Sequence, residues 1–248
     1  MKNIKLTIEY DGTHYGGWQK QNNNSTIQDE LQKAIYKVTG EEVDLIGSSR
    51  TDAGVHARGM VANFKTESKV PPERFREAIN TKLPDDIGII KSEEVPIDFN
   101  ARYDSKGKTY CYTIINRLEK VAIQKDYVYH VKDKLDIELM KKSCNYFVGK
   151  HDFKAFRTSG SSVKTSVRTI TDLHIDTVTS SFGTKILFYI TADGFLYNMV
   201  RIIIGTLVEV GRGKISEASI PLIIKSGDRS KAGYCAPASG LTLLEVYY

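Results

Sequence analysis

The stretch GSSRTDAGVHARG (47–59) contains a single carboxylate, Asp52, with Arg50 and Arg58 within six positions of it. A carboxylate serves as a nucleophile or a general base when a fold places it against a reacting group. An Asp before small residues and Gly is also a common turn signature, because its side chain bonds its own turn. The stretch has no second acid, whereas glycosidases use a pair. Taken alone, it favours a turn, and a catalytic role depends on its surroundings.

Two segments concentrate positive charge beside aromatic rings. Residues 102–125 hold six Lys/Arg against two acids, and residues 150–168 hold five against one. Cationic side chains neutralise phosphates, and rings stack on unpaired bases, so with a net charge of +5 the pattern is typical of RNA binding. A solvated basic face over core aromatics is the alternative, and the sequence leaves it open. The rings in question are Tyr103, Tyr110, Tyr112, Phe153 and Phe156.

The sequence contains no local motif for binding a metal or a nucleotide cofactor. The three cysteines are odd in number and widely spaced, and the five histidines form no HxxxH or HxH pattern. There is neither a phosphate-binding GxxxxGK[ST] loop nor a GxGxxG turn. We therefore expect no metal and no cofactor. The longest apolar run, inside 202–208, is too short to span a bilayer, and residues 1–10 lack a signal-peptide pattern, so we expect a cytoplasmic protein without membrane contact.

The first half of the chain predicts a strand–helix–strand–strand–helix–strand order. Alternating apolar residues predict a strand over 1–10, and Ser25-x-x-Gln28 resembles a capping box for a helix ending at Gly40. Strands near 42–48 and 58–66 flank the loop with Asp52, Pro71-Pro72 opens a second helix, and 86–95 returns as a strand. The inward positions of the two helices are predicted at Ile27, Leu31, Ile35, Val38, Phe75, Ala78 and Ile79.

The second half repeats this plan with insertions. Strands are predicted at 108–116, 126–132, 166–178, 184–192 and 241–247, and helices at 135–148, 195–211 and 216–226, the last capped by Ser216 and Gly227. The predicted fold is α+β: two ferredoxin-like, RRM-like halves whose antiparallel sheets join into one extended sheet of mixed connectivity, with helices on one face. The predicted domains are residues 1–100, with the Asp52 loop, and 101–248.

Arg201 lies in FLYNMVRIIIGTLVEV (195–210), a predicted helix that is apolar nearly all round. An arginine buried in such a helix is rarely left unpaired. The alternative is a side chain that extends to solvent from the start of the helix. Tyr110, in the strand GKTYCYTI (107–114), has an equally simple alternative as a core aromatic of a strand.

Several motifs together resemble the tRNA pseudouridine synthases of the TruA type. They run in the family's order from residue 10 to the C-terminus, and RTDAGVHA with YNMVR is highly specific in combination. The motifs are YDGTHYGGWQKQ (10–21), RTDAGVHA (50–57), NARYDSKGKTYCYTI (100–114), DFKAF (152–156), GFLYNMVRIIIGTLVEVGRG (194–213) and AGYCAPASGLTLLEVYY (232–248).

The resemblance implies a cofactor-independent isomerase that converts uridines 38, 39 and 40 of the tRNA anticodon arm to pseudouridine. It implies that Asp52 is the catalytic aspartate, that Arg201 pairs with it, and that Tyr110 stacks on the flipped-out base. Arg58 is a candidate to hold that state through a phosphate, although a plain surface arginine is the alternative. His56 is interpreted as a packing or orienting residue and not as the base. Further contacts to RNA are expected from Arg50, Lys106, Lys108 and Lys154. The family also implies a homodimer, and no other protein partner.

Two rival functions fit this sequence less well. A non-catalytic RNA-binding module on the same scaffold is disfavoured because Asp52, Tyr110 and Arg201 are all present. A metal-dependent RNA hydrolase lacks paired acids and histidine clusters. The chain departs from the family pattern at Ser49, Met60 and Cys111, none of which replaces the aspartate.

Overall fold

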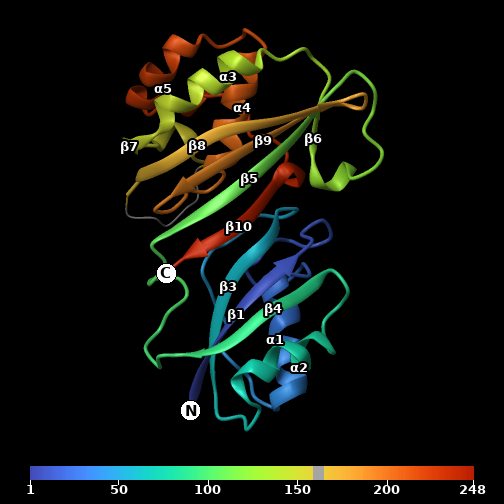
Figure 1. Ribbon diagram of the computed structural model, residues 1–248. Helices are drawn as coiled ribbons and strands as arrows, with labels where there is room; N and C mark the ends of the chain where they lie inside the picture. The colour runs from blue at the N-terminus through green and yellow to red at the C-terminus, as the bar shows by residue number, and fades with distance from the viewer. Residues whose placement is uncertain (159–164) are drawn as a thin grey trace. The chain divides into compact units, whose positions relative to one another are not determined.

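The computed structural model describes residues 1–158 and 165–248 (Figure 1). The described residues form ten strands, all of them in β-sheet with parallel and antiparallel pairings, and five α-helices, which confirms the predicted α+β class. They divide into two compact units, residues 1–106 with 242–248 and residues 107–241. The predicted division into domains 1–100 and 101–248 stays a prediction, although the C-terminal strand belongs to the first unit.

The first unit has the predicted βαββαβ order. Its elements are β1 (Lys2–Tyr10), α1 (Ile27–Thr39), β2 (Ile46–Gly47), β3 (His56–Thr66), α2 (Phe75–Asn80) and β4 (Ile87–Val95). Strand β1 lies between β4 and β3 and is antiparallel to both, and β2 pairs with the far side of β3. This is the strand order of a ferredoxin-like unit. The last strand, β10 (Leu241–Tyr247), pairs in parallel with the start of β3.

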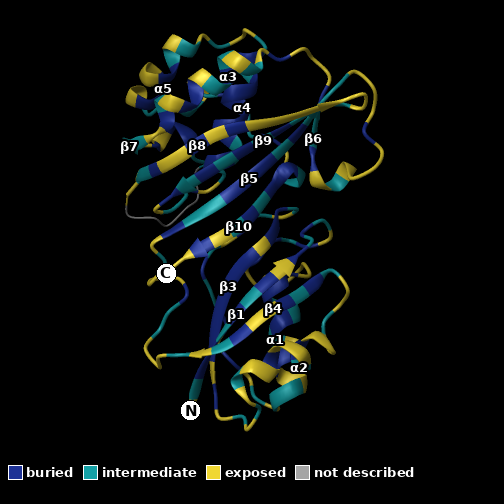
Figure 2. Cartoon of the chain, in the orientation of Figure 1, coloured by how far each residue is buried: buried dark blue, intermediate teal, exposed yellow. Residues whose placement is uncertain are grey.

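The core of this unit lies between the sheet and its two helices. From Ile4 to Tyr10 every second residue of β1 is buried, whereas Lys5, Thr7 and Glu9 between them are partly or fully exposed (Figure 2). Helices α1 and α2 pack over the buried face (Figure 1). Fully buried side chains from both layers are Ile4, Leu6, Ile8, Ile27, Leu31, Ile35, Phe75 and Ile79. Val38 and Ala78, also predicted to face inward, are only half-buried.

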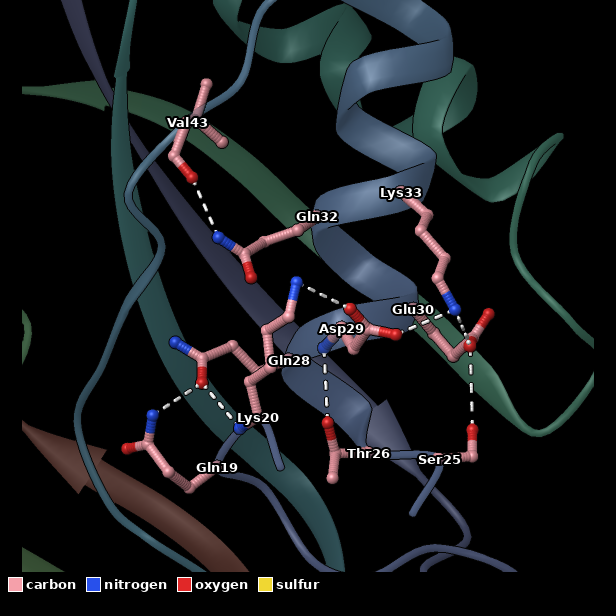
Figure 3. Close-up of polar contacts among 10 residues, drawn as sticks. All are labelled: Gln19, Lys20, Ser25, Thr26, Gln28, Asp29, Glu30, Gln32, Lys33 and Val43. Carbon is pink, nitrogen blue, oxygen red and sulfur yellow. Dashed lines mark hydrogen bonds and ion pairs between the residues drawn. The ribbon is translucent and has the colours of Figure 1, made fainter. Parts of the chain in front are cut away.

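The predicted capping box of α1 is wrong by one residue. Thr26, not Ser25, caps the helix, and its Oγ1 accepts the N–H of Asp29 at 3.4 Å. Gln28 does not fold back onto the cap, because its amide oxygen accepts the Lys20 N–H of the preceding loop (Figure 3). Its amide nitrogen donates to the Leu45 carbonyl. The predicted end at Gly40 is confirmed, with a left-handed φ of 76°.

The second unit is built on a four-stranded antiparallel path, β5-β9-β8-β7, with β6 added in parallel to β5. Its elements are β5 (Gly107–Asn116), β6 (Tyr129–Val131), α3 (Ile137–Cys144), β7 (Gly149–Asp152), β8 (Val167–Ser180), β9 (Gly183–Ala192), α4 (Met199–Gly211) and α5 (Ile220–Ser226). Helix α4 is the centre of this core, since all its residues except Arg201 and Glu209 are buried.

Three predictions in this half need correction. Helix α3 ends at Cys144, and the short strand β7, which was not predicted, follows it. Helix α4 begins at Met199 rather than at 195, because Asn198 has a φ of 61° that helical backbone does not allow. Ser216 precedes a short 3-10 turn and forms no side-chain cap, whereas Gly227 ends α5 as predicted. Lys164, in the second basic stretch, lies outside the described residues.

No helix within residues 1–158 and 165–248 combines the length and the apolarity needed to cross a membrane.

Candidate active site

The catalytic candidate Asp52 lies on a tight turn just before β3. The N–H of Val55 donates to the carbonyl of Asp52 at 3.1 Å, and Gly54 has the positive φ of 76° that this turn requires. The preceding residue is held from two directions. The hydroxyl of Tyr10, at the end of β1, lies 2.7 Å from Thr51 Oγ1, and the N–H of Trp18 donates to the Thr51 carbonyl at 3.0 Å. Asp52 itself is half-buried, and these contacts fix the position of its backbone.

Two glycines of the 10–21 motif allow this packing. A Cβ at Gly17 would lie 2.5 Å from the Thr51 carbonyl oxygen and 3.0 Å from the Asp52 carbonyl carbon, and Gly17 has a φ of +98°. A Cβ at Gly12 would collide with the carbonyl oxygen of Val55. The loop after β1 therefore lies directly on the backbone of the Asp52 turn, and only residues without side chains fit at the contact.

The far end of the same loop is anchored on α1 (Figure 3). Gln28 Oε1 accepts the backbone N–H of Lys20 and the side-chain amide of Gln19, both at 2.9 Å. Lys20 also forms an ion pair with Asp29 at 2.9 Å, and Asp29 pairs with Lys33 at 2.7 Å. Hydrogen bonds from Lys33 and Lys20 lower the pKa of the Asp29 carboxyl. The loop that holds the Asp52 turn is thus tied to β1 at one end and to α1 at the other.

His56, the first residue of β3, is buried and also joins the loop after β1 to the chain that follows the Asp52 turn. Its Nδ1 lies 3.1 Å from the backbone N of Gly12 and 3.1 Å from Asp11 Oδ1. Because one ring nitrogen cannot accept and donate at once, the tautomer decides which of these two bonds forms. Either bond ties the Asp52 turn to the loop after β1, which agrees with the interpretation of His56 as a packing residue.

Replacement of Gly17 by Ala is expected to lower activity by about 100-fold, because a backbone shift near 1 Å misplaces Asp52. Gly40→Ala is the matched control: Gly40 also has a positive φ, 76°, but a Cβ added there would meet no atom within 4 Å. Both variants carry a strain of about 1–2 kcal/mol in the free energy of unfolding, which urea denaturation measures. The single-turnover rate should fall in Gly17→Ala and stay at the wild-type value in Gly40→Ala. An equal rate in the two variants would refute the proposed role of the contact.

Arg201 lies in the first turn of α4, in the second unit, and its guanidinium donates hydrogen bonds to Ala236 and Asn198. Its Nε donates to the carbonyl of Ala236 at 2.7 Å, and its Nη1 donates to Asn198 Oδ1 at 2.8 Å. Asn198 Nδ2 in turn donates to Thr158 Oγ1 at 2.9 Å. The side chain is therefore held by the helix start and by the 232–237 segment.

The 232–237 segment lies along α4 at contact distance. A Cβ at Gly205 would collide with the Tyr234 carbonyl, and one at Gly233 would meet the backbone of Thr206. The N–H of Gly233 donates to Thr206 Oγ1 at 2.9 Å, and the N–H of Ala236 donates to the Arg201 carbonyl at 3.1 Å. These contacts determine where the Ala236 carbonyl, and hence the Arg201 guanidinium, is placed.

Tyr110 also belongs to the second unit, on β5. It is 6% exposed, and its ring packs edge-on against Phe195 with centroids 5.1 Å apart. Phe195 lies three residues before Asn198, so the loop before α4 contacts both Tyr110 and Arg201. Two residues along β5, the hydroxyl of Tyr112 donates to the Pro237 carbonyl at 2.7 Å. Burial raises the pKa of Tyr112 well above its usual value, which keeps this hydroxyl protonated.

The cationic candidates are spread over both units. Arg50, Arg58, Lys106 and Lys154 are exposed, and Lys108 is half-buried. The aromatic residues of the basic stretches are different: Tyr110, Tyr112, Phe153 and Phe156 are all at most 6% exposed and belong to the core. Phe153 and Phe156 are fully buried and Tyr112 is buried against the Pro237 carbonyl, so these three rings fit the core alternative, whereas the role of Tyr110 stays a prediction. Tyr103, at 74%, is the exception.

Sequence reasoning missed the residues that position the candidates. Asn198 and Ala236 hold Arg201, and Gly12, Gly17 and Thr51 support the Asp52 turn. Each of them lies inside one of the quoted motifs, so the signal was present. Their roles depend on backbone contacts between distant segments, which spacing alone does not reveal.

Comparison with known proteins identifies the class. A family model described as tRNA pseudouridine synthase matches residues 6–104 and 143–248. The tRNA pseudouridine synthase A 2 of Clostridium perfringens is 62% identical over 248 residues, with 100% of both chains covered. The tRNA pseudouridine synthases A of Clostridium botulinum (strain Alaska E43) and Acetivibrio thermocellus are each 58% identical, again over 100% of both chains. A solved Cbf5-Nop10-Gar1 complex covers 96% of this chain and 57% of that one at 13% identity, and its TM-score of 0.37 is too low to support an argument.

The chain therefore belongs to the tRNA pseudouridine synthase family, in its TruA type. As a member of this family it is an isomerase, and the resemblance drawn from the motifs is confirmed.

Proposed function

We propose that this protein converts uridine to pseudouridine at positions 38, 39 and 40 of the tRNA anticodon arm, in conventional tRNA numbering. Family membership over the full chain supports the reaction class. The observation that carries the proposal is the construction around Asp52: a half-buried carboxylate on a turn whose backbone is held by Tyr10, Trp18 and Gly17.

The reaction requires the enzyme to hold the uracil and the sugar in position, and it consumes no second substrate. The bond from C1′ to N1 breaks, the uracil turns within the pocket, and a bond from C1′ to C5 forms. The C5 proton is lost and N1 ends protonated, so no atom is gained from outside. Because a free uracil anion would diffuse away in water, the pocket must hold both fragments in register, which is proximity catalysis. We assign no cofactor to this chemistry.

Asp52 is proposed to act by one of two routes. In the first, the carboxylate attacks C1′ and forms a covalent adduct, which the returning C5 displaces. In the second, the carboxylate removes the C2′ proton as the C1′–N1 bond breaks, which forms a glycal, and the proton returns to C2′ when C5 bonds to C1′. Both routes need an ionised Asp52 aimed at the sugar.

Arg201 and Tyr110 are proposed to complete the site. We propose that the Arg201 guanidinium pairs with the Asp52 carboxylate, keeping it ionised and oriented. The two bonds to Ala236 and Asn198 support this role, because they fix the guanidinium at the start of α4. Tyr110 is proposed to stack on the uracil after it leaves the helical stem, since the reacting bond of a stacked nucleotide is shielded. Its hydroxyl would assist loss of the C5 proton.

The substrate is proposed to be tRNA held by phosphate contacts, with a homodimer as the working form. Arg58 is proposed to hold the flipped-out nucleotide, and Arg50, Lys106, Lys108 and Lys154 to contact phosphates. Four of these five side chains are exposed, as such contacts require.

Binding should therefore depend strongly on salt. With about six phosphate contacts, log affinity is expected to fall with log salt at a slope of about −4 to −6. Alanine at Lys106, Lys108 or Lys154 should each reduce the slope by about 1 without abolishing single-turnover chemistry. Lys37→Ala, an exposed lysine of α1, is the control and should change neither. Filter binding between about 50 mM and 300 mM salt measures the slope, and a slope near zero would exclude these contacts.

The rival function is a non-catalytic RNA-binding module on the same scaffold. Loss of the C5 hydrogen of uridine distinguishes the two functions, because only the isomerase causes it. Unmodified tRNA carrying tritium at C5 of uridine should release tritium to water with this protein in single turnover. Tight binding without release would favour the binding module and end the proposal.

A further inference from the structure

Among the aromatic residues of the two basic stretches, Tyr103 is the one that is not buried in the core. Its side chain is 74% exposed, on the loop between β4 and β5. The Arg102 guanidinium lies over its ring, with Cζ 5.4 Å from the centroid. A tyrosine with an arginine over one face keeps the rest of its ring open to a second flat partner.

The loop that carries Tyr103 is firmly held. Asn100 Oδ1 accepts the N–H of Arg102 at 3.0 Å and that of Tyr103 at 3.1 Å, as an Asx turn does. The N–H of Asp104 donates to the Asn100 carbonyl at 3.0 Å, and Asp104 Oδ2 accepts the Asn100 N–H at 2.8 Å. Asp104, the acid next to Tyr103, is thus turned back into its own turn.

The same loop is tied to the sheet of the first unit. Ala101, fully buried, donates its N–H to Asn63 Oδ1 on β3 at 2.8 Å, and its carbonyl accepts the Tyr248 hydroxyl at 2.7 Å. Just beyond the Asx turn, chain positions 105 and 106 lead back to the sheet, where the Lys106 N–H donates to the Tyr247 carbonyl at 2.8 Å. An exposed ring on such a supported backbone loses little conformational entropy when a ligand binds.

The charge around Tyr103 favours a polyanion. Arg102 and Lys106 are both exposed, and the side chain of Asp104, which is also exposed, accepts the Asn100 N–H within the turn. A ring flanked by cations is the combination that binds unpaired nucleotides, where the ring stacks on a base and the cations meet the backbone.

We propose that Tyr103 is a stacking platform for an unpaired base of the tRNA substrate, with Arg102 and Lys106 on its flanking phosphates. The inference rests on the proposed function, because that function supplies the RNA, and it adds a contact outside the catalytic residues.

Fluorescence tests the stacking directly. The chain has one tryptophan, Trp18, which is 1% exposed, so a tryptophan placed at position 103 reports on that position after the wild-type signal is subtracted. Tyr103→Trp is expected to show saturable quenching when unmodified tRNA is added. Tyr36→Trp is the matched control, since Tyr36 is 53% exposed in the same unit on α1, and its emission should stay constant.

Affinity gives a second readout. Tyr103→Ala should weaken tRNA binding about 10-fold, whereas Tyr103→Phe, which keeps the ring, should bind like the wild type. The salt slope of Tyr103→Ala should match the wild type because no phosphate contact is lost. Wild-type affinity in Tyr103→Ala, or no quenching in Tyr103→Trp, would overturn the proposal. A change in self-association by sedimentation, with unchanged affinity, would make Tyr103 a protein–protein contact instead. Pseudouridine formation by the wild type is scored separately, so failure of stacking leaves the proposed function intact.

Discussion

Asp52→Asn is expected to fold and to bind tRNA, yet to form no detectable pseudouridine. The amide keeps the shape of the carboxylate and its place on the turn, but it is neither a nucleophile nor a base at neutral pH. The loss should therefore appear in the chemical step, by about 10³-fold or more. Tritium release in single turnover measures that step, and filter binding measures the affinity.

A charge-matched control separates this effect from general electrostatics. Asp44→Asn removes a carboxylate that is exposed in the same unit, and it should leave the rate unchanged. If Asp52→Asn worked at the wild-type rate, Asp52 would return to the simpler interpretation of a turn residue.

Arg201→Met is expected to lower catalysis sharply at neutral pH, with partial recovery as pH rises. If Arg201 pairs with Asp52, its removal leaves the carboxylate in a partly dry pocket without a counter-charge, at a cost of about 3–5 kcal/mol. The carboxylate relieves part of this cost by binding a proton, so its pKa rises in the variant. A raised pKa means that the ionised, active form is lost at neutral pH and regained at higher pH. RNA affinity should change much less.

The pH profile decides between the two interpretations of Arg201. Single-turnover rates from about pH 6 to 9 should rise more steeply in Arg201→Met than in the wild type. If Arg201 instead contacts solvent or phosphate, affinity should fall and the two profiles should run parallel. Arg74→Met, which removes an exposed arginine of the first unit, is the control for loss of positive charge.

Local sequence patterns predicted the helices and strands that have one buried face and one exposed face. The alternation of Ile4, Leu6 and Ile8 identified β1 because one face of that strand packs under helices. The cap of α1 was misplaced because Ser25 and Thr26 are adjacent and both can cap. The Gln28 amide oxygen that a capping box would use accepts from Gln19 and Lys20 instead. The start of α4 was predicted too early because Asn198, whose backbone has a left-handed conformation, lies inside an apolar run that predicts a continuous helix.

The sequence proposes the candidate residues of the site but not the residues that support them. Asp52, Tyr110 and Arg201 emerged from the resemblance, since each residue type alone has a common structural explanation. Gly17 could not be assigned a role from the sequence, because what it contacts is the backbone of Thr51 and Asp52, far along the chain. The same holds for Ala236, which binds Arg201 from a different segment through its carbonyl. Spacing reports periodicity within an element, and these contacts join separate elements.

The most direct test of the central claim is to map pseudouridine on an unmodified tRNA transcript with uridine at positions 38, 39 and 40. Carbodiimide adducts that survive alkali stop primer extension at pseudouridine and not at uridine. The wild-type protein should produce stops that correspond to these three positions, and Asp52→Asn, at the same concentration, should produce none. Stops elsewhere in the tRNA would contradict the assigned positions. The same stops with Asp52→Asn would contradict the role of Asp52, and no stops with the wild-type protein would contradict the proposed function itself.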